Sequence, residues 1–247
     1  MKEKNYNLTK KFDGDEAAQQ FLEKHKFLPE FRTLLFNQFM DAQDYEGAKE
    51  CMYEGIEVNK EYSGIVIDWV KNLLEVANKT DDRDLKIKMC KTLFVNLGFG
   101  VYAENIEYYE LLKEELSKEE WEETLPELIK YVEGNETLNE IYYREGLLQL
   151  LYKSVTTQSN FYFGRNQLIF NPKYIEILML PYNKELQQFL KNRIENYLEV
   201  YKGKNYYKEV CTTLILFKKA GMDINPIINY LKEKFNRRPS LQERLKE

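Results

Sequence analysis

Few residues in this sequence could carry catalysis, and those few are scattered. His25 is the single histidine, and the three cysteines, Cys51, Cys90 and Cys211, lie far apart. A metal site or a histidine-activated nucleophile needs several such groups at defined spacings. The sequence contains no Cys-x-x-Cys, His-Glu-x-x-His or Gly-x-Ser-x-Gly motif. We therefore predict no catalytic residue, no metal ligand and no enzyme activity, with His25 at the surface or at the edge of the core.

A glycine pattern at residues 98–103, GFGVYA, matches the G-x-G-x-x-A fingerprint of dinucleotide-binding turns. That turn binds phosphate only where a strand delivers it to the N-terminus of a helix. The preceding LKIKMCKTLFVNL has helical periodicity instead. We interpret the glycines as the end of one helix before the next, and we predict no cofactor.

Adjacent glutamates occur at residues 114–115, 119–120 and 122–123. Two carboxylates can divide acid and base roles when they converge on one substrate. Neighbouring residues of a helix point in different directions, so these pairs do not converge. We interpret them as solvated helix faces.

Aromatic residues are abundant, with 19 Tyr and 14 Phe. Where two are adjacent in a helix, one ring points into the core and its neighbour stays partly exposed. Core packing accounts for most of these runs. Exposed aromatic and arginine side chains nevertheless dominate protein-binding hot spots. On this basis the predicted partner-binding residues are Tyr108, Tyr142, Tyr143, Phe161, Tyr162, Arg165, Tyr206, Arg237 and Arg238.

The net charge of −5 argues against a nucleic-acid-binding protein, because phosphate contacts need a basic surface. The charge is uneven, however. Residues 104–145 contain fourteen acidic and four basic residues, a net of −10, whereas residues 184–247 contain fourteen basic and eight acidic residues, a net of +6. Such regions steer a charged partner or are merely solvated helix faces.

Amphipathic helices must position all of these residues. The stretch Phe31–Lys60, FRTLLFNQFMDAQDYEGAKECMYEGIEVNK, predicts two helices joined by a turn at Gln43 and Asp44. Small residues at Ala48 and Gly55 would let the second helix lie close to the first. A hairpin of this kind leaves an apolar side that needs a similar neighbour. The hairpin therefore predicts a stack of helix pairs.

The rest of the chain has the same character. Ser117-x-x-Glu120 and Thr137-x-x-Glu140 match the capping box that begins a helix. Pro172 predicts another helix start, and residues 155–172 are the least periodic part. We predict an all-α fold, an α-solenoid of stacked antiparallel hairpins forming a right-handed superhelix with irregular repeats. It would comprise a flexible segment at residues 1–14 and one helical-repeat domain at residues 15–247.

Two resemblances follow from these helices. The residues around Asp44-Tyr45-Glu46-x-Ala48 resemble the turn and second helix of a tetratricopeptide unit. The stretches LPEFRTLLFNQFMDAQDYEGAKECMYEGIEVNK, IVIDWVKNLL and YYKEVCTTLILFKKAG with the later INYLKEKFNRRPSLQERL are similar to the helical region of bacterial SWIM zinc-finger proteins. The Cys-x-Cys…Cys-x-His pattern of that family is absent, so its metal cannot be transferred to this chain.

These observations predict a cytoplasmic, non-enzymatic scaffold that binds a protein or peptide along a helical surface. The separated cysteines indicate reduced thiols, and no signal peptide or long apolar run is present. The alternative is an accessory helical domain of a zinc-finger protein that acts near nucleic acid. A third possibility is a hydrolase or transferase with an unfamiliar site, which would require a deep pocket.

Overall fold

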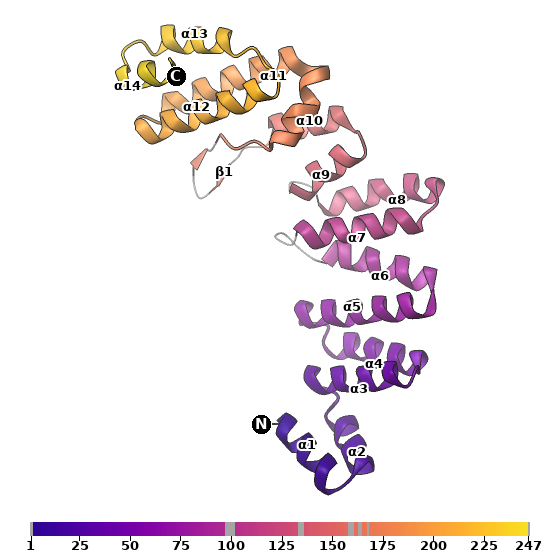
Figure 1. Ribbon diagram of the computed structural model, residues 1–247. Helices are drawn as coiled ribbons and strands as arrows, with labels where there is room; N and C mark the ends of the chain where they lie inside the picture. Colours follow the sequence, from indigo (N-terminus) through magenta and orange to yellow (C-terminus); the bar gives the residue numbers. More distant parts are fainter. Residues whose placement is uncertain are drawn as a thin grey trace. The chain divides into compact units, whose positions relative to one another are not determined.

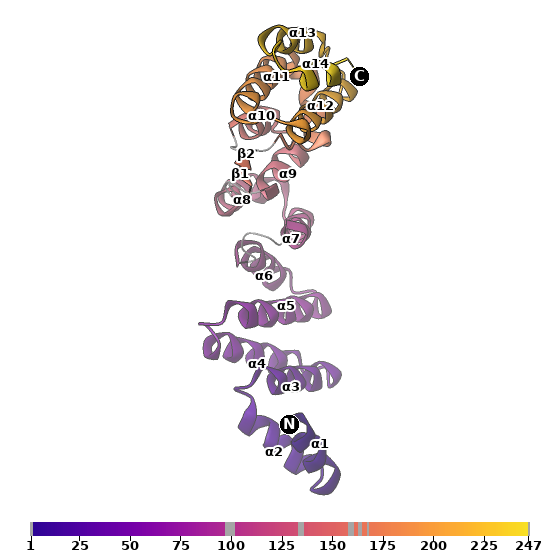
Figure 2. The same cartoon turned by 90° about the vertical axis from the view of Figure 1, so that its left-hand side faces the viewer.

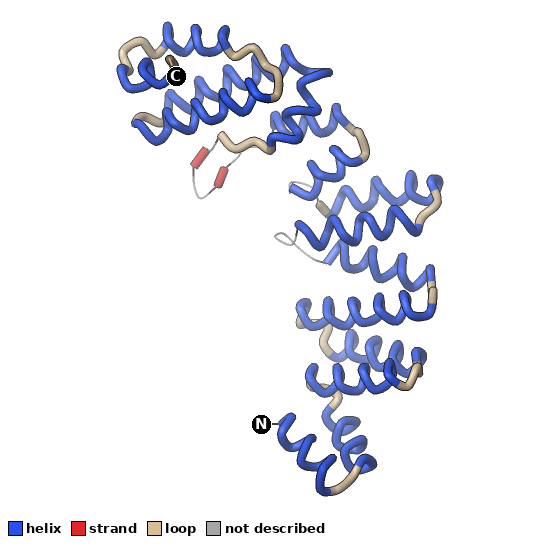
Figure 3. Tube along the Cα trace, in the orientation of Figure 1, coloured by secondary structure: helices blue, strands red, loops and turns tan. Residues whose placement is uncertain are grey.

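The structure, a computed structural model, describes residues 2–96, 102–132, 136–157, 161–162, 165–166 and 168–246. The fold is all-α, and the described part adds one short antiparallel ladder, in which Phe161–Tyr162 (β1) pairs with Arg165–Asn166 (β2) (Figure 3). This confirms the predicted all-α class. The chain divides into two compact units, Met1–Thr137 and Leu138–Glu247, whereas the sequence predicted one domain over residues 15–247.

The first unit is a succession of antiparallel helices, each packed on the next (Figures 1 and 2). Helices that are neighbours in sequence are therefore neighbours in space. Its helices are α1 (Lys2–Phe12), α2 (Asp15–His25), α3 (Pro29–Asp41), α4 (Tyr45–Val58), α5 (Ser63–Thr80), α6 (Arg83–Asn96), α7 (Tyr102–Glu115) and α8 (Lys118–Tyr131).

The hairpin predicted for Phe31–Lys60 is present as α3 and α4. Gln43 takes a left-handed conformation with φ of 57°. The next residue, Asp44, caps α4, because its carboxylate accepts a hydrogen bond from the Gly47 N–H at 3.0 Å. Ala48 is fully buried, as its small size suggested. The turn residues therefore reverse the chain just where the apolar faces of α3 and α4 can meet.

Gly55 permits a close approach between helices of this unit. A Cβ atom at this position would lie 2.6 Å from Cδ of Arg32 and 3.1 Å from Cδ1 of Trp69. The absence of a side chain at Gly55 thus makes room for the buried arginine of α3.

The starts of α6 and α8 also follow from polar caps. Asp82 accepts a hydrogen bond from the Leu85 N–H at 3.0 Å. The Ser117 hydroxyl accepts from the Glu120 N–H at 3.2 Å, and the Glu120 carboxylate accepts from the Ser117 N–H at 2.8 Å. This is the predicted capping box, and it satisfies donors that a helix start leaves unpaired.

The N-terminal residues differ from expectation. The sequence predicted a flexible segment over residues 1–14, but α1 occupies Lys2–Phe12 and packs against α2. Tyr6 is buried, and its hydroxyl lies 3.5 Å from Nε2 of Gln38 in α3. Packing of this ring stabilises a helix whose mostly polar sequence indicates little intrinsic order.

The second unit contains α9 (Glu136–Arg144, which begins just before the unit boundary), α10 (Leu148–Thr157), the β1–β2 ladder, α11 (Pro172–Val200), α12 (Lys204–Lys219), α13 (Asn225–Lys234) and α14 (Pro239–Arg244). Gly146 separates α9 from α10 with φ of 66°, a conformation that favours glycine. The ladder lies within residues 155–172, the least periodic part of the sequence.

The second predicted capping box is wrong. Helix α9 begins at Glu136, so Thr137 lies inside the helix and not before it. Glu140 is also buried, and its carboxylate bonds side chains of α9 and α11. Glu140 therefore makes tertiary contacts, whereas the local motif predicted that it would cap the helix.

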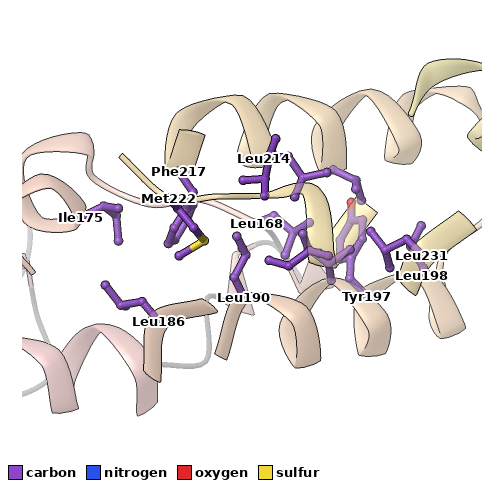
Figure 4. Packing of buried hydrophobic residues seen from close by; sticks show 14 of the residues in the cluster. Leu168, Ile175, Leu186, Leu190, Tyr197, Leu198, Leu214, Phe217, Met222 and Leu231 are labelled. Atoms are coloured by element: carbon purple, nitrogen blue, oxygen red, sulfur yellow. The ribbon is translucent and has the colours of Figure 1, made fainter. Parts of the chain in front are cut away.

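The core of the second unit lies between α11, α12 and α13 (Figure 4). Helix α11 starts at Pro172, as predicted, and kinks after Pro181, where Tyr182 leaves helical geometry. Beyond the kink, apolar residues recur every four positions and face the other two helices. The residues labelled in Figure 4 are Leu168, Ile175, Leu186, Leu190, Tyr197, Leu198, Leu214, Phe217, Met222 and Leu231. Within the part of the chain that is described, no helix has the length and apolar character needed to cross a membrane.

Candidate functional site

The predicted partner-binding tyrosines are more deeply placed than expected. Tyr108 is 6% exposed and belongs to the core of the first unit. Tyr142 and Tyr143 are partly buried against the core of the second unit. Tyr206 is also partly buried, and its ring stacks on Tyr201 with centroids 5.0 Å apart. These rings therefore contribute first to packing.

The two predicted arginines near the C-terminus differ from each other. Arg238 donates from Nη1 to the Leu198 carbonyl oxygen at 2.6 Å, and its guanidinium lies 4.5 Å from the Phe235 ring centroid. Arg237 is exposed. Arg238 thus fastens the segment after α13 to α11, and Arg237 remains on the surface. The structure leaves undescribed the side chains of three further predicted partner-binding residues, Phe161, Tyr162 and Arg165.

Tyr143 adjoins a buried charge cluster around Glu140, which is 2% exposed. The Glu140 carboxylate accepts hydrogen bonds from Arg144 Nε at 2.7 Å and from the Tyr174 hydroxyl at 2.9 Å, and it pairs with the Lys173 ammonium. That ammonium lies 5.0 Å from the Tyr143 ring centroid. Two cations and a hydroxyl compensate this carboxylate, so the cluster joins α9 to α11 and has no base free for catalysis.

A second buried polar group lies in the first unit. Arg32 is 1% exposed, and its Nη1 donates to the Cys51 carbonyl oxygen at 2.6 Å. Glu54 lies 3.4 Å from the same nitrogen and 2.9 Å from the Lys26 ammonium. The hydrogen bond with Lys26 lowers the pKa of Glu54. This chain of charges links α2, α3 and α4.

The surroundings of His25, Cys51 and Cys90 indicate that these residues serve packing. His25 stacks on Phe21 at a centroid distance of 4.2 Å, and its Nδ1 lies 2.8 Å from the Phe21 carbonyl oxygen. Burial raises the pKa of the Cys90 thiol to about 11 and also raises that of Cys51. Raised pKa values keep both sulfurs as thiols at neutral pH. Among the residues that the structure describes, no three His, Cys, Asp or Glu side chains form a group that could hold a metal ion.

A shallow groove of about 310 Å³ lies between α6 and α8. Arg83 lines it, but this guanidinium already bonds the Glu115 carbonyl oxygen at 2.8 Å and the Glu120 carboxylate at 2.6 Å. Glu120 and Glu123 both line the groove, together with Asp84 and Lys91, whereas Glu122 is exposed beside Lys118. The groove therefore offers a charged surface on which Arg83 already pairs with Glu120.

Residues 98–101 of the glycine fingerprint lie outside the described part of the chain. The residues before it form α6, which ends at Asn96. The strand that a dinucleotide-binding turn requires is thus replaced by a helix.

Helix α12 carries a surface that the sequence reasoning missed. Lys204, Lys208, Ile215 and Lys219, here called the α12 stripe, are all exposed. At about 100° per residue they fall within roughly 60° of one another around the helix. Spacings of four, seven and four residues were visible in the sequence, but burial was needed to show which face of α12 meets solvent.

The single carboxylate of this helix does not reach the stripe. Glu209 accepts hydrogen bonds from the Leu168 N–H at 2.8 Å and from the Tyr197 hydroxyl at 2.5 Å. Burial raises the pKa of Tyr197, and the hydrogen bond with Glu209 raises it further. Glu209 therefore binds the segment before α11 and leaves the lysines uncompensated.

No family model matches the chain, and no curated protein matches it.

Proposed function

We propose that this chain is a non-enzymatic scaffold of helical-repeat type that binds another protein or a peptide. The observation that carries the proposal is the succession α3 to α7, in which each helix packs on its neighbours in sequence. In such an arrangement the stacked helices together form one long surface, and surfaces of this kind bind extended partners. On this reading the first unit is an irregular α-solenoid with a right-handed superhelical course, resembling tetratricopeptide arrays, in a cytoplasmic protein.

The polar groups of the described residues are consistent with a binding role. The buried ions Glu140 and Arg32 hold helices together, and Arg83 in the α6–α8 groove is already bonded to Glu115 and Glu120. A protein that acts through shape needs rigid helices and a varied surface more than a deep pocket.

A displayed library of random peptides, selected on the immobilised full chain, tests the proposal. We expect enrichment of particular sequences and saturable binding of the synthetic peptides, measured by fluorescence anisotropy. Enrichment equal to that on an unrelated helical protein would overturn it. Turnover of a generic ester, phosphate or glycoside substrate would favour an enzyme instead.

The second candidate is an accessory helical domain of a zinc-finger protein that acts near nucleic acid. The observation that favours it is the excess of basic residues over 184–247, with uncompensated lysines on α12. It predicts retention of DNA or RNA that weakens steeply with salt. A flat titration at low ionic strength would remove it.

A further inference from the structure

The α12 stripe has the properties of a docking surface for an acidic segment. Its three lysines are exposed, and none makes an ion pair within the described residues. Lys202 and Lys218 add two further exposed cations beside it. The segment Tyr201–Met222 contains five lysines and one acidic residue, Glu209, in a chain whose net charge is −5. Positive charge is therefore concentrated here against the balance of the whole chain.

Two other lysines of the second unit are paired with carboxylates. Lys234 in α13 pairs with Glu195 and lies 3.0 Å from the Glu199 carboxylate, both on α11. Lys173 pairs with Glu140. Helix α12 has the opposite arrangement, because its one carboxylate points to Leu168 and Tyr197. The lysines of the stripe therefore lack the carboxylate partners that Lys234 and Lys173 have.

Ile215 separates the two ends of the stripe and is 51% exposed. An exposed isoleucine among lysines gives a partner an apolar contact as well as charge. The span from Lys204 to Lys219 is about 22 Å, at about 1.5 Å per residue. An extended peptide of about seven residues has the same length.

We propose that the α12 stripe binds an acidic peptide segment, with carboxylates over Lys204 and Lys208, an apolar side chain on Ile215 and a further carboxylate over Lys219. This rests on the proposed function and names the partner class of one of its surfaces. Nucleic acid fits less well, because the central Ile215 offers an apolar contact that the phosphate backbone does not use.

The test uses the full chain and a short fluorescein-labelled peptide that has glutamates at both ends and a leucine between them. We expect saturable anisotropy at low salt that weakens as NaCl rises, because exposed pairs are screened. The same peptide with glutamines in place of the glutamates should bind at least about tenfold more weakly. Absence of saturable binding by the acidic peptide overturns the proposal.

Charge reversal locates the surface. The K204E/K208E variant should weaken binding of the acidic peptide by at least about tenfold. The matched control is K153E/K184E, which reverses two exposed lysines of the same unit on α10 and α11 and should change affinity less than about twofold. Ile215→Ala should weaken binding by about threefold, and Ile177→Ala on α11 should have no effect. Far-ultraviolet circular dichroism and melting temperatures establish that the variants are folded.

The remaining outcomes separate the two proposals. Equal loss in the control variant, or none in K204E/K208E, assigns the peptide to another surface and overturns the α12 site. Tighter binding of an oligothymidine of equal charge overturns the acidic-peptide assignment in favour of nucleic acid. If library-selected peptides bind both variants like the original chain while the acidic peptide does not bind, the scaffold function stands and the α12 site falls.

Discussion

At the scale of single residues, the most informative feature is that three charged groups serve packing. Glu140 and Arg32 are buried with partners from other helices. Glu209 accepts a hydrogen bond from the Leu168 N–H in the segment before α11. Removing one partner of a buried pair leaves the other charge uncompensated, which costs more than the pair contributes. These residues are therefore the places where substitutions act on stability.

Glu140→Gln should lower the free energy of unfolding by about 1–3 kcal/mol, because it removes the charge opposite Lys173 and Arg144 and an acceptor for Tyr174. Urea unfolding followed by circular dichroism measures the effect. Glu199→Gln, at a 53% exposed carboxylate beside Lys234, is the control and should cost less than about 0.5 kcal/mol. Equal effects of the two variants would contradict a structural role for Glu140.

Glu54 should make stability depend on acid pH. Its pKa is lowered in the folded protein, chiefly by the hydrogen bond from Lys26. Its contribution is therefore present above the unfolded pKa of about 4.5 and is lost as pH falls through the lower folded value. Melting temperatures between about pH 7 and pH 3 should fall more steeply for the original chain than for Glu54→Gln. Parallel curves would show that Glu54 contributes nothing.

At the scale of elements, local chemistry set many helix boundaries correctly. The Ser117 capping box and the Pro172 start are where the sequence predicted them. These features depend on residues within one turn of each other. The Thr137 box failed because Glu140 has partners in α11 that no local pattern reveals.

Ser117→Ala should destabilise the protein by about 1 kcal/mol, because α8 loses an acceptor for the Glu120 N–H. Thermal unfolding measures it. Thr212→Ala, at an exposed position of α12, is the control and should be within about 0.5 kcal/mol of the original chain. A melting temperature for Ser117→Ala equal to that of the control would refute the role of this cap.

At the scale of the whole molecule, the chain divides into two compact units, and the single domain predicted over residues 15–247 stays a prediction until cooperativity is measured. Helical stacks transmit stability mainly between neighbours. A perturbation in one unit should therefore stay within it.

Arg32→Met tests this expectation, since it removes the buried charge between α3 and α4. Hydrogen exchange followed by mass spectrometry should show loss of protection within residues 2–96 and 102–132, with residues 168–246 unchanged. Uniform loss through both units would show one cooperative domain over residues 15–247 instead.

Helical periodicity, caps and breakers were sufficient to predict an all-α chain and the α3–α4 hairpin, because those features depend on residues a few positions apart. They did not reveal the burial of Tyr108, the cluster at Glu140 or the break at Gly146. The exposed face of α12 was equally hidden, since a lysine pattern shows a stripe but not whether another helix covers it. Burial is a property of the packed chain, so tertiary structure alone decided which polar residues hold helices together and which are free to meet a partner.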